Sequence, residues 1–133
     1  EPLGADFDRD AAMLRITDPG EYPFVEVAPS DPLPTNAWCM ALGHPGGYDP
    51  VRTPPLRLGR VLGYGEFLIT DSTVVSGDSG GPLYVVDDDG EYWLLGATSR
   101  GASNGRNACG DGGIYVRVGE FAAWIKQAAG VAI

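Results

Sequence analysis

The segment Gly77-Asp78-Ser79-Gly80-Gly81-Pro82 is the most informative stretch of this 133-residue sequence. A serine hydroxyl is a weak nucleophile unless a base removes its proton and hydrogen-bond donors stabilise the oxyanion that develops. Glycines beside a serine let the backbone turn sharply and direct main-chain N–H groups at one point. The segment therefore predicts a nucleophilic Ser79, with the N–H groups of Gly77 and Ser79 forming an oxyanion hole.

The pattern Gly-x-Ser-x-Gly also occurs in the nucleophile elbow of α/β-hydrolases. That elbow requires a helix directly after the serine and a histidine later in the chain. Here Ser79 is followed by Gly-Gly-Pro and a strand-like run at residues 83–86, and no histidine follows it. The α/β-hydrolase alternative is therefore excluded.

Composition restricts the possible partners. The formal net charge is −9, so a nucleic acid or an anionic membrane surface is not an expected partner. A hydrophobic content of 44% is typical of a globular domain rather than a disordered chain. No apolar run approaches the roughly 20 residues that a membrane-spanning helix needs. The sequence therefore predicts one globular domain with no membrane span and no nucleic-acid partner.

The order of apolar runs and turn residues predicts a mostly β chain. Strand-like runs, separated by clusters of Gly, Pro and Asp, occupy residues 11–17, 38–42, 56–63, 66–70, 83–86, 92–98 and 114–118. Five prolines between residues 18 and 36 predict an extended connector, and residues 87–90 predict a hairpin turn. One helix is expected at the C-terminus, where Phe121, Trp124, Ile125 and Ala128 recur at helical spacing.

Several segments resemble, in order, the motifs of trypsin-like (chymotrypsin-type) serine proteases. GDSGGP resembles the nucleophile motif of that family, and residues 10–14 (DAAML) resemble the strand that carries the triad aspartate. Residues 95–101 (LGATSRG) resemble the substrate-binding strand, residues 113–118 (GIYVRV) the strand behind the specificity pocket, and residues 121–125 (FAAWI) the terminal helix. The resemblance runs from Asp10 to Ile125 and so covers most of the chain.

The resemblance implies an all-β fold of the trypsin-like double β-barrel type. This chain would hold the last strand of barrel one, a complete antiparallel Greek-key barrel two and a C-terminal helix. The expected boundaries are residues 1–17 for the end of the first barrel and 18–36 for the interbarrel connector. Residues 37–118 would form the second barrel, and residues 119–133 the helix.

The same resemblance implies a serine endopeptidase that acts through a Ser-His-Asp acyl-enzyme mechanism on a polypeptide substrate, outside the cell or in the periplasm. Ser79 would be the nucleophile, Asp10 would orient the histidine, and Asp78 would support the oxyanion loop. In active members the residue at Asp78 pairs with a newly cleaved N-terminus, and its partner here is left open. No cofactor or metal is implied. The substrate-binding positions would be Thr73, Val74, Ser99, Arg100, Gly101 and Gly113.

Thr73 stands at the expected floor of the primary pocket. Because a buried cation needs a counter-charge, Thr73 predicts cleavage after neutral residues rather than after Arg or Lys. Thr98 stands where acid-specific relatives carry a pocket histidine. Arg100 replaces the usual tryptophan, and it is expected either to contact an acidic substrate residue or to be solvated.

One departure from the family concerns the general base. The triad order in this family is histidine, aspartate, serine. The single histidine, His44, lies between Asp10 and Ser79, in a Gly-His-Pro-Gly-Gly turn, and is expected to be structural. We therefore expect an N-terminal portion of the same protease, absent from this sequence, to supply the histidine. The alternative is a catalytically inactive trypsin-like binding module.

The two cysteines, Cys39 and Cys109, leave two possibilities open. A disulfide between them would close a long loop and contribute about 4 kcal/mol in the chain-entropy model. Two free thiols are the alternative. In the trypsin-like family two further cysteine positions correspond to Val75 and Val85, so both cysteines resemble halves of disulfides whose partners are apolar here.

Overall fold

The computed structural model describes residues 1–29, 31, 33–102 and 111–130. The strands are β1 (Pro2–Asp6), β2 (Ala11–Leu14), β3 (Glu26–Val27), β4 (Trp38–Leu42), β5 (Leu56–Tyr64), β6 (Phe67–Thr70), β7 (Pro82–Val86), β8 (Tyr92–Ala102) and β9 (Gly112–Arg117). A 3₁₀ helix, η1 (Val118–Phe121), leads into the helix α1 (Ala122–Ala129). The strand predicted at residues 38–42 is confirmed residue for residue, and the terminal helix is confirmed as well.

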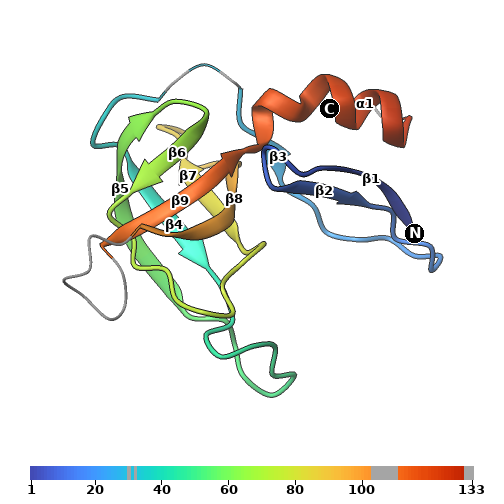
Figure 1. Ribbon diagram of the computed structural model, residues 1–133, viewed down its shortest axis with the longest axis horizontal. Coiled ribbons are helices and arrows are strands. Elements are labelled where there is room, and N and C mark those ends of the chain that lie inside the picture. Colours follow the sequence, from blue (N-terminus) through green and yellow to red (C-terminus); the bar gives the residue numbers. More distant parts are fainter. Residues whose placement is uncertain (30, 32, 103–110, 131–133) are drawn as a thin grey trace.

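Six antiparallel strands of the described chain close a barrel (Figure 1). They hydrogen-bond in the order β8-β7-β4-β5-β6-β9, and β9 pairs again with β8. Strand β8 closes the barrel because it is 11 residues long: its first part pairs with β7 and its second part with β9. The predicted all-β architecture is confirmed. Among the described residues, no helix has the length and apolar character needed to cross a bilayer.

Alternation along the strands places one set of side chains inside the barrel. In β4, Trp38 is exposed, Cys39 is fully buried, and Ala41 is buried again two residues later. Side chains of a β-strand point alternately to its two faces, so this period of two separates core from surface. The core cluster comprises Ala28, Cys39, Ala41, Val61, Leu68, Val74, Leu83, Val85, Leu95 and Tyr115.

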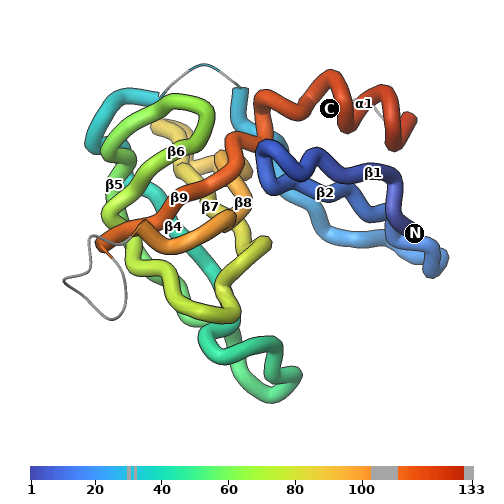
Figure 2. The backbone as a smooth tube through the Cα atoms, viewed as in Figure 1, coloured from blue at the N-terminus to red at the C-terminus, as the bar shows by residue number. Residues whose placement is uncertain are grey.

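A hairpin of β1 and β2 lies outside the barrel, beside α1 (Figure 1). The tube in Figure 2 shows the chain leaving this hairpin and running as the connector to β4 on the barrel. Gly4 of β1 lies so close to α1 that a Cβ there would approach Cζ2 of Trp124 to 2.9 Å. The hairpin and the helix therefore pack as one unit that carries Asp10 in the turn just before β2.

The connector departs in one place from the strand-free segment that its prolines predict. Glu26 and Val27 form β3, which pairs in parallel with Trp93 and Leu94 of β8. The Ala28 N–H extends this pairing by donating to the Leu94 carbonyl at 2.8 Å. Prolines exclude a central strand but allow a short edge strand between them, which explains the difference.

The Cys39 side chain faces the barrel interior as a free thiol, directly opposite Val85 on β7. The alternative of a Cys39–Cys109 disulfide involves Cys109, which lies outside the described residues. Burial raises the pKa of the Cys39 thiol from its ordinary value of 9.0 to about 11. The thiol is therefore neutral throughout the physiological range.

This pKa shift predicts a loss of stability in alkaline solution. The folded-state pKa lies above the unfolded value, so the neutral thiol stabilises the fold fully below about pH 9, and this contribution is lost as the pH rises toward 11. We expect the free energy of unfolding to fall by about 2 kcal/mol over that interval because of Cys39. Urea denaturation at several pH values measures it, with Cys39→Ala as the comparison. An equally steep decline in Cys39→Ala would contradict the assignment.

Candidate active site

The turn that carries Ser79 connects the loop after β6 to β7. Its glycines adopt the left-handed backbone that other residues disfavour: φ is +98° at Gly77 and +78° at Gly80. The Gly80 N–H donates to the Thr98 carbonyl at 2.8 Å, and the Thr98 N–H donates to the Gly81 carbonyl at 2.9 Å. These bonds fix the turn against β8, and the Ser79 side chain remains exposed.

Thr98 belongs to this support. Its side chain is buried, and its hydroxyl Oγ1 donates to the Gly81 carbonyl at 3.0 Å. By the family resemblance, Thr98 stands at the position of a pocket histidine in acid-specific relatives. In this chain the Thr98 hydroxyl instead holds the turn that carries Ser79.

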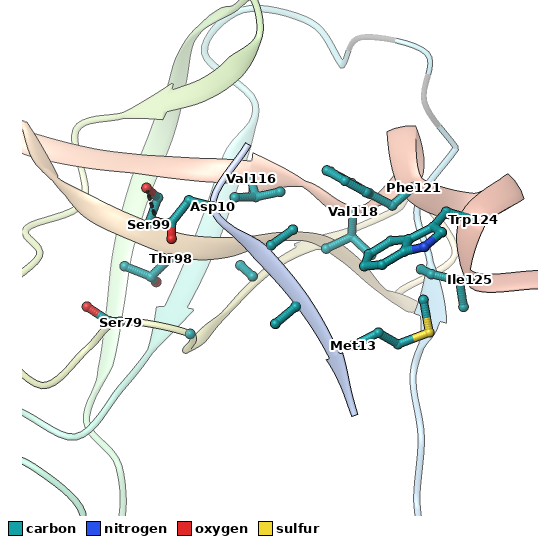
Figure 3. A pocket seen from close by; sticks show the side chains of 14 residues that line it. Asp10, Met13, Ser79, Thr98, Ser99, Val116, Val118, Phe121, Trp124 and Ile125 are labelled. Carbon is teal, nitrogen blue, oxygen red and sulfur yellow. Dashed lines mark hydrogen bonds between the residues drawn. The ribbon is translucent and has the colours of Figure 1, made fainter. Parts of the chain in front are cut away.

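Asp10 is brought to the same region from a distant part of the sequence. It ends the β1–β2 turn with φ of +55°, a conformation that aspartate tolerates better than most residues. The Ser99 hydroxyl donates to Oδ2 of Asp10 at 2.7 Å (Figure 3). Ser99 therefore links the β1–β2 hairpin to β8, the strand that fixes the turn around Ser79.

Ser79, Asp10 and Ser99 line one cavity of about 580 Å³. Figure 3 shows Asp10, Ser99, Thr98 and Ser79 toward one end, and Met13, Val118, Phe121, Trp124 and Ile125 toward the other. Among the described residues that line the cavity, Asp10 is the only titratable one. The cavity thus joins the predicted nucleophile and the predicted aspartate, but no described residue in it can act as a histidine base.

His44 is not among the residues that line this cavity. Its ring packs edge-on against Tyr48, with centroids 5.1 Å apart, and a side chain at Gly77 would collide with its carbonyl. The Gly46 N–H donates to the Ser76 carbonyl at 2.8 Å. The turn around His44 therefore supports the backbone before Ser79, in agreement with the structural role expected for it.

The main-chain donors expected to form the oxyanion hole are available. Among the hydrogen bonds between described residues, neither the Gly77 N–H nor the Ser79 N–H donates to an acceptor. An oxyanion hole requires such unengaged donors, held by a backbone that does not reorganise during the reaction. The contacts of the His44 turn with Ser76 and Gly77 provide that support.

Asp78 has a partner that no sequence pattern indicates. Its side chain is 2% exposed, and Oδ2 accepts hydrogen bonds from Arg57 Nη1 at 2.8 Å and from the Val75 N–H at 2.9 Å. Arg57 lies on β5 between Leu56 and Leu58. In such an alternation of apolar and charged residues, an arginine is expected on the solvent-exposed face of the strand. Only the tertiary fold brings it beneath the oxyanion loop.

The residues expected to bind substrate are distributed along neighbouring segments. Val74 is buried, and a Cβ at Gly101 would lie 3.2 Å from its carbonyl oxygen. Gly101 on β8 pairs directly with Gly113 on β9, while Thr73 is half-buried in the loop before Val74. The structure therefore brings Val74, Gly101 and Gly113 together. Residues 103–110, between β8 and β9, lie outside the described part of the chain.

Arg100 is neither fully solvated nor unattached. Its Nη1 donates to the Ser99 hydroxyl at 3.0 Å, and its guanidinium carbon lies 4.6 Å from the centroid of the Phe67 ring.

Within the described residues, no group of three or more His, Cys, Asp or Glu side chains is arranged to hold a metal ion.

The chain belongs to the trypsin-like peptidase domain family, whose pattern matches residues 1–96. A probable periplasmic serine endoprotease, DegP-like, of Marinomonas sp. (strain MWYL1) is 35% identical over 92 residues, which cover 65% of this chain and 19% of that protein. The corresponding protein of Ectopseudomonas mendocina (strain ymp) is 37% identical over 87 residues, which cover 62% of this chain and 18% of that protein. The chain therefore spans about a fifth of the length of these relatives.

Solved structures support the same fold. An HtrA-type protease, AlgW, determined with a tripeptide, aligns with a TM-score of 0.73 and 24% sequence identity. The alignment covers 96% of this chain and 42% of that one. The same protease with a decapeptide aligns with a TM-score of 0.72 and 23% identity, covering all of this chain and 41% of that one.

Proposed function

We propose that this chain forms part of a serine endopeptidase that cleaves polypeptides through an acyl-enzyme. Ser79 is the nucleophile, Asp10 orients and stabilises the histidine, and the Gly77 and Ser79 amides bind the oxyanion. The observation that carries the proposal is the Ser99–Asp10 hydrogen bond at 2.7 Å, in the cavity that Ser79 also lines. Asp10, 89 positions from Ser99 in the sequence, is thereby held at the cavity that Ser79 lines, in a chain that belongs to a family of peptidases.

The histidine base, in this proposal, comes from a polypeptide segment outside these 133 residues, the N-terminal portion of the same protease. The cavity between Asp10 and Ser79 leaves space for an imidazole and offers a carboxylate to orient it. Large apolar side chains of the hairpin and connector are exposed, among them Phe7 at 92%, Leu14 at 74% and Phe24 at 86%. Exposed apolar groups on this scale favour a further segment that covers them.

The relatives named above are described as periplasmic, and we extend that location to this protease. The substrate is a polypeptide, because the chain belongs to a peptidase family and the relatives named above are serine endoproteases. The reaction requires neither a metal nor an organic cofactor, because the Ser-His-Asp mechanism uses side chains and main-chain donors alone.

Labelling with a fluorophosphonate probe tests the proposal. We expect no labelling of this chain alone, because Ser79 lacks a base, and labelling at Ser79 when the preceding coding segment is expressed with it. Ser79→Ala should abolish the labelling, whereas Ser76→Ala, a control three residues earlier, should retain it. Strong labelling of the lone chain would contradict the external base. No labelling of the longer protein would favour an inactive binding module.

A further inference from the structure

Arg100 has two contacts that fix its guanidinium beside the proposed active site. One is the hydrogen bond from Nη1 to Ser99 Oγ at 3.0 Å, and the other is the stacking of the guanidinium on Phe67 at 4.6 Å. The side chain is exposed, so burial does not hold it there. A charge-assisted hydrogen bond and a cation–π contact together restrict its rotamers.

The chemistry of the three groups fixes the direction of their hydrogen bonds. A guanidinium has donors and no acceptor, and an ionised carboxylate has acceptors and no donor. A serine hydroxyl has one proton, so Ser99 must accept from Arg100 if it donates to Asp10. The resulting chain runs from Arg100 through Ser99 to Oδ2 of Asp10.

A second reading of Arg100, a clamp for an acidic substrate residue, fits these contacts less well. The Arg100 guanidinium already donates to Ser99 of its own chain. Ser99 in turn donates to Asp10, so the carboxylate to which Arg100 is connected by hydrogen bonds is that of Asp10. Arg9, the cation next to Asp10 in sequence, is turned away: it pairs with Asp6 at 3.1 Å and stacks on Phe121 at 4.8 Å. The arrangement favours a role toward Asp10.

We propose that Arg100 is a positioning residue for the triad aspartate, acting through Ser99. The cation fixes the rotamer of the Ser99 hydroxyl and strengthens the hydrogen bond that it donates, so that Asp10 keeps the orientation that the histidine requires. This inference rests on the proposed function. Because Arg100 acts on the geometry of the catalytic groups and not on substrate binding, its loss should lower kcat and leave KM nearly unchanged.

The test uses the protease that includes its histidine segment, with a peptide substrate free of acidic residues. Arg100→Met keeps an apolar stem over Phe67 and removes the donors, and we expect a decrease of about tenfold in kcat. Arg60→Met is the matched control. Arg60 is an exposed arginine on β5, and its guanidinium carbon lies 4.2 Å from the centroid of the Trp38 ring. It should retain the kcat of the unmodified enzyme.

A double-mutant cycle separates positioning from a general structural effect. In a Ser99→Ala background, Arg100→Met should have little further effect on kcat, because the intermediary hydroxyl is already absent. Arg100→Ala should regain activity when guanidinium chloride is added at millimolar concentration, but not with sodium chloride. Additive losses in the cycle, or a KM effect restricted to substrates with acidic residues, would overturn the inference. Absence of turnover by the unmodified enzyme would overturn the proposed function itself, and this role with it.

Discussion

Replacing Arg57 with methionine is expected to lower the free energy of unfolding by about 3–5 kcal/mol and to reduce kcat/KM by about 100-fold or more. Asp78 is 2% exposed, and one of its oxygens accepts both Arg57 Nη1 and the Val75 N–H. Methionine preserves the length and the apolar character of the side chain, but leaves the carboxylate buried without a counter-charge. An uncompensated buried charge is among the most costly single changes to a fold.

The loss of activity follows from the proposed function, in which Asp78 lies between the two oxyanion donors, Gly77 and Ser79. If the Asp78 carboxylate moves toward water to regain solvation, the backbone on both sides of it must move as well. Gly43 leaves no room for a small adjustment, since a side chain there would already collide with Asp78. The two amides would then no longer converge on one point, and one misplaced oxyanion donor costs about 10²–10³ in kcat.

Chemical denaturation and steady-state kinetics measure the two effects. Arg60→Met, on the same strand but exposed, is the control and should change stability by less than about 1 kcal/mol. Adding Asp78→Asn to Arg57→Met removes the unpaired charge and should restore part of the lost stability. An Arg57→Met enzyme with unchanged stability and rate would show that the ion pair is dispensable.

The Arg57–Asp78 pair also answers a question that the sequence left open. In active members of the family the residue at Asp78 pairs with a newly cleaved N-terminus, and the sequence leaves the partner of Asp78 open. In this chain an internal arginine occupies Oδ2 of Asp78 at 2.8 Å. The other oxygen of this carboxylate, Oδ1, is buried and has no hydrogen-bond partner among the described residues.

The barrel strands were predictable because their information is local. Alternation of buried and exposed residues in β4, and the helical stripe that includes Phe121 and Trp124, are periodic patterns that a sequence displays directly. Strand β1 was not predicted, because Pro2 and Gly4 lie within its five residues and weaken any strand pattern. Its formation depends on pairing with β2 and on Gly4 packing against Trp124.

The candidate site likewise contains residues that the local sequence identifies and residues that only the tertiary fold brings together. Ser79 was recognisable from GDSGGP because the glycines that the turn requires are adjacent to it in sequence. The Arg57 partner of Asp78 and the Asp10 partner of Ser99 were not, because these pairs lie 21 and 89 residues apart and meet only in the tertiary fold. An arginine in an alternating strand usually lies on a solvated face. Only the three-dimensional structure shows that Arg57 forms an ion pair with a buried aspartate instead.

Cleavage after leucine or phenylalanine is expected to exceed cleavage after arginine by about 100-fold or more in kcat/KM. The prediction rests on Thr73 as the floor of the primary specificity pocket, which is a proposal from family resemblance. Thr73 is half-buried, and its hydroxyl makes no hydrogen bond to any other described residue. One hydroxyl can satisfy one hydrogen bond, but it cannot neutralise a guanidinium.

The measurement is a series of peptides that differ only in the residue before the cleaved bond, assayed with the protease that contains its histidine segment. Thr73→Val, nearly identical in shape, should keep the preference for neutral residues, whereas Thr73→Asp should narrow the gap toward arginine and lysine. Because the buried Val74 lies next to the floor and its carbonyl approaches Gly101, tryptophan should be a poorer substrate residue than leucine, phenylalanine or tyrosine. A profile of the unmodified enzyme that is led by arginine or lysine would require a carboxylate at the pocket floor, which Thr73 does not provide. The assignment of Thr73 to its floor would then be wrong.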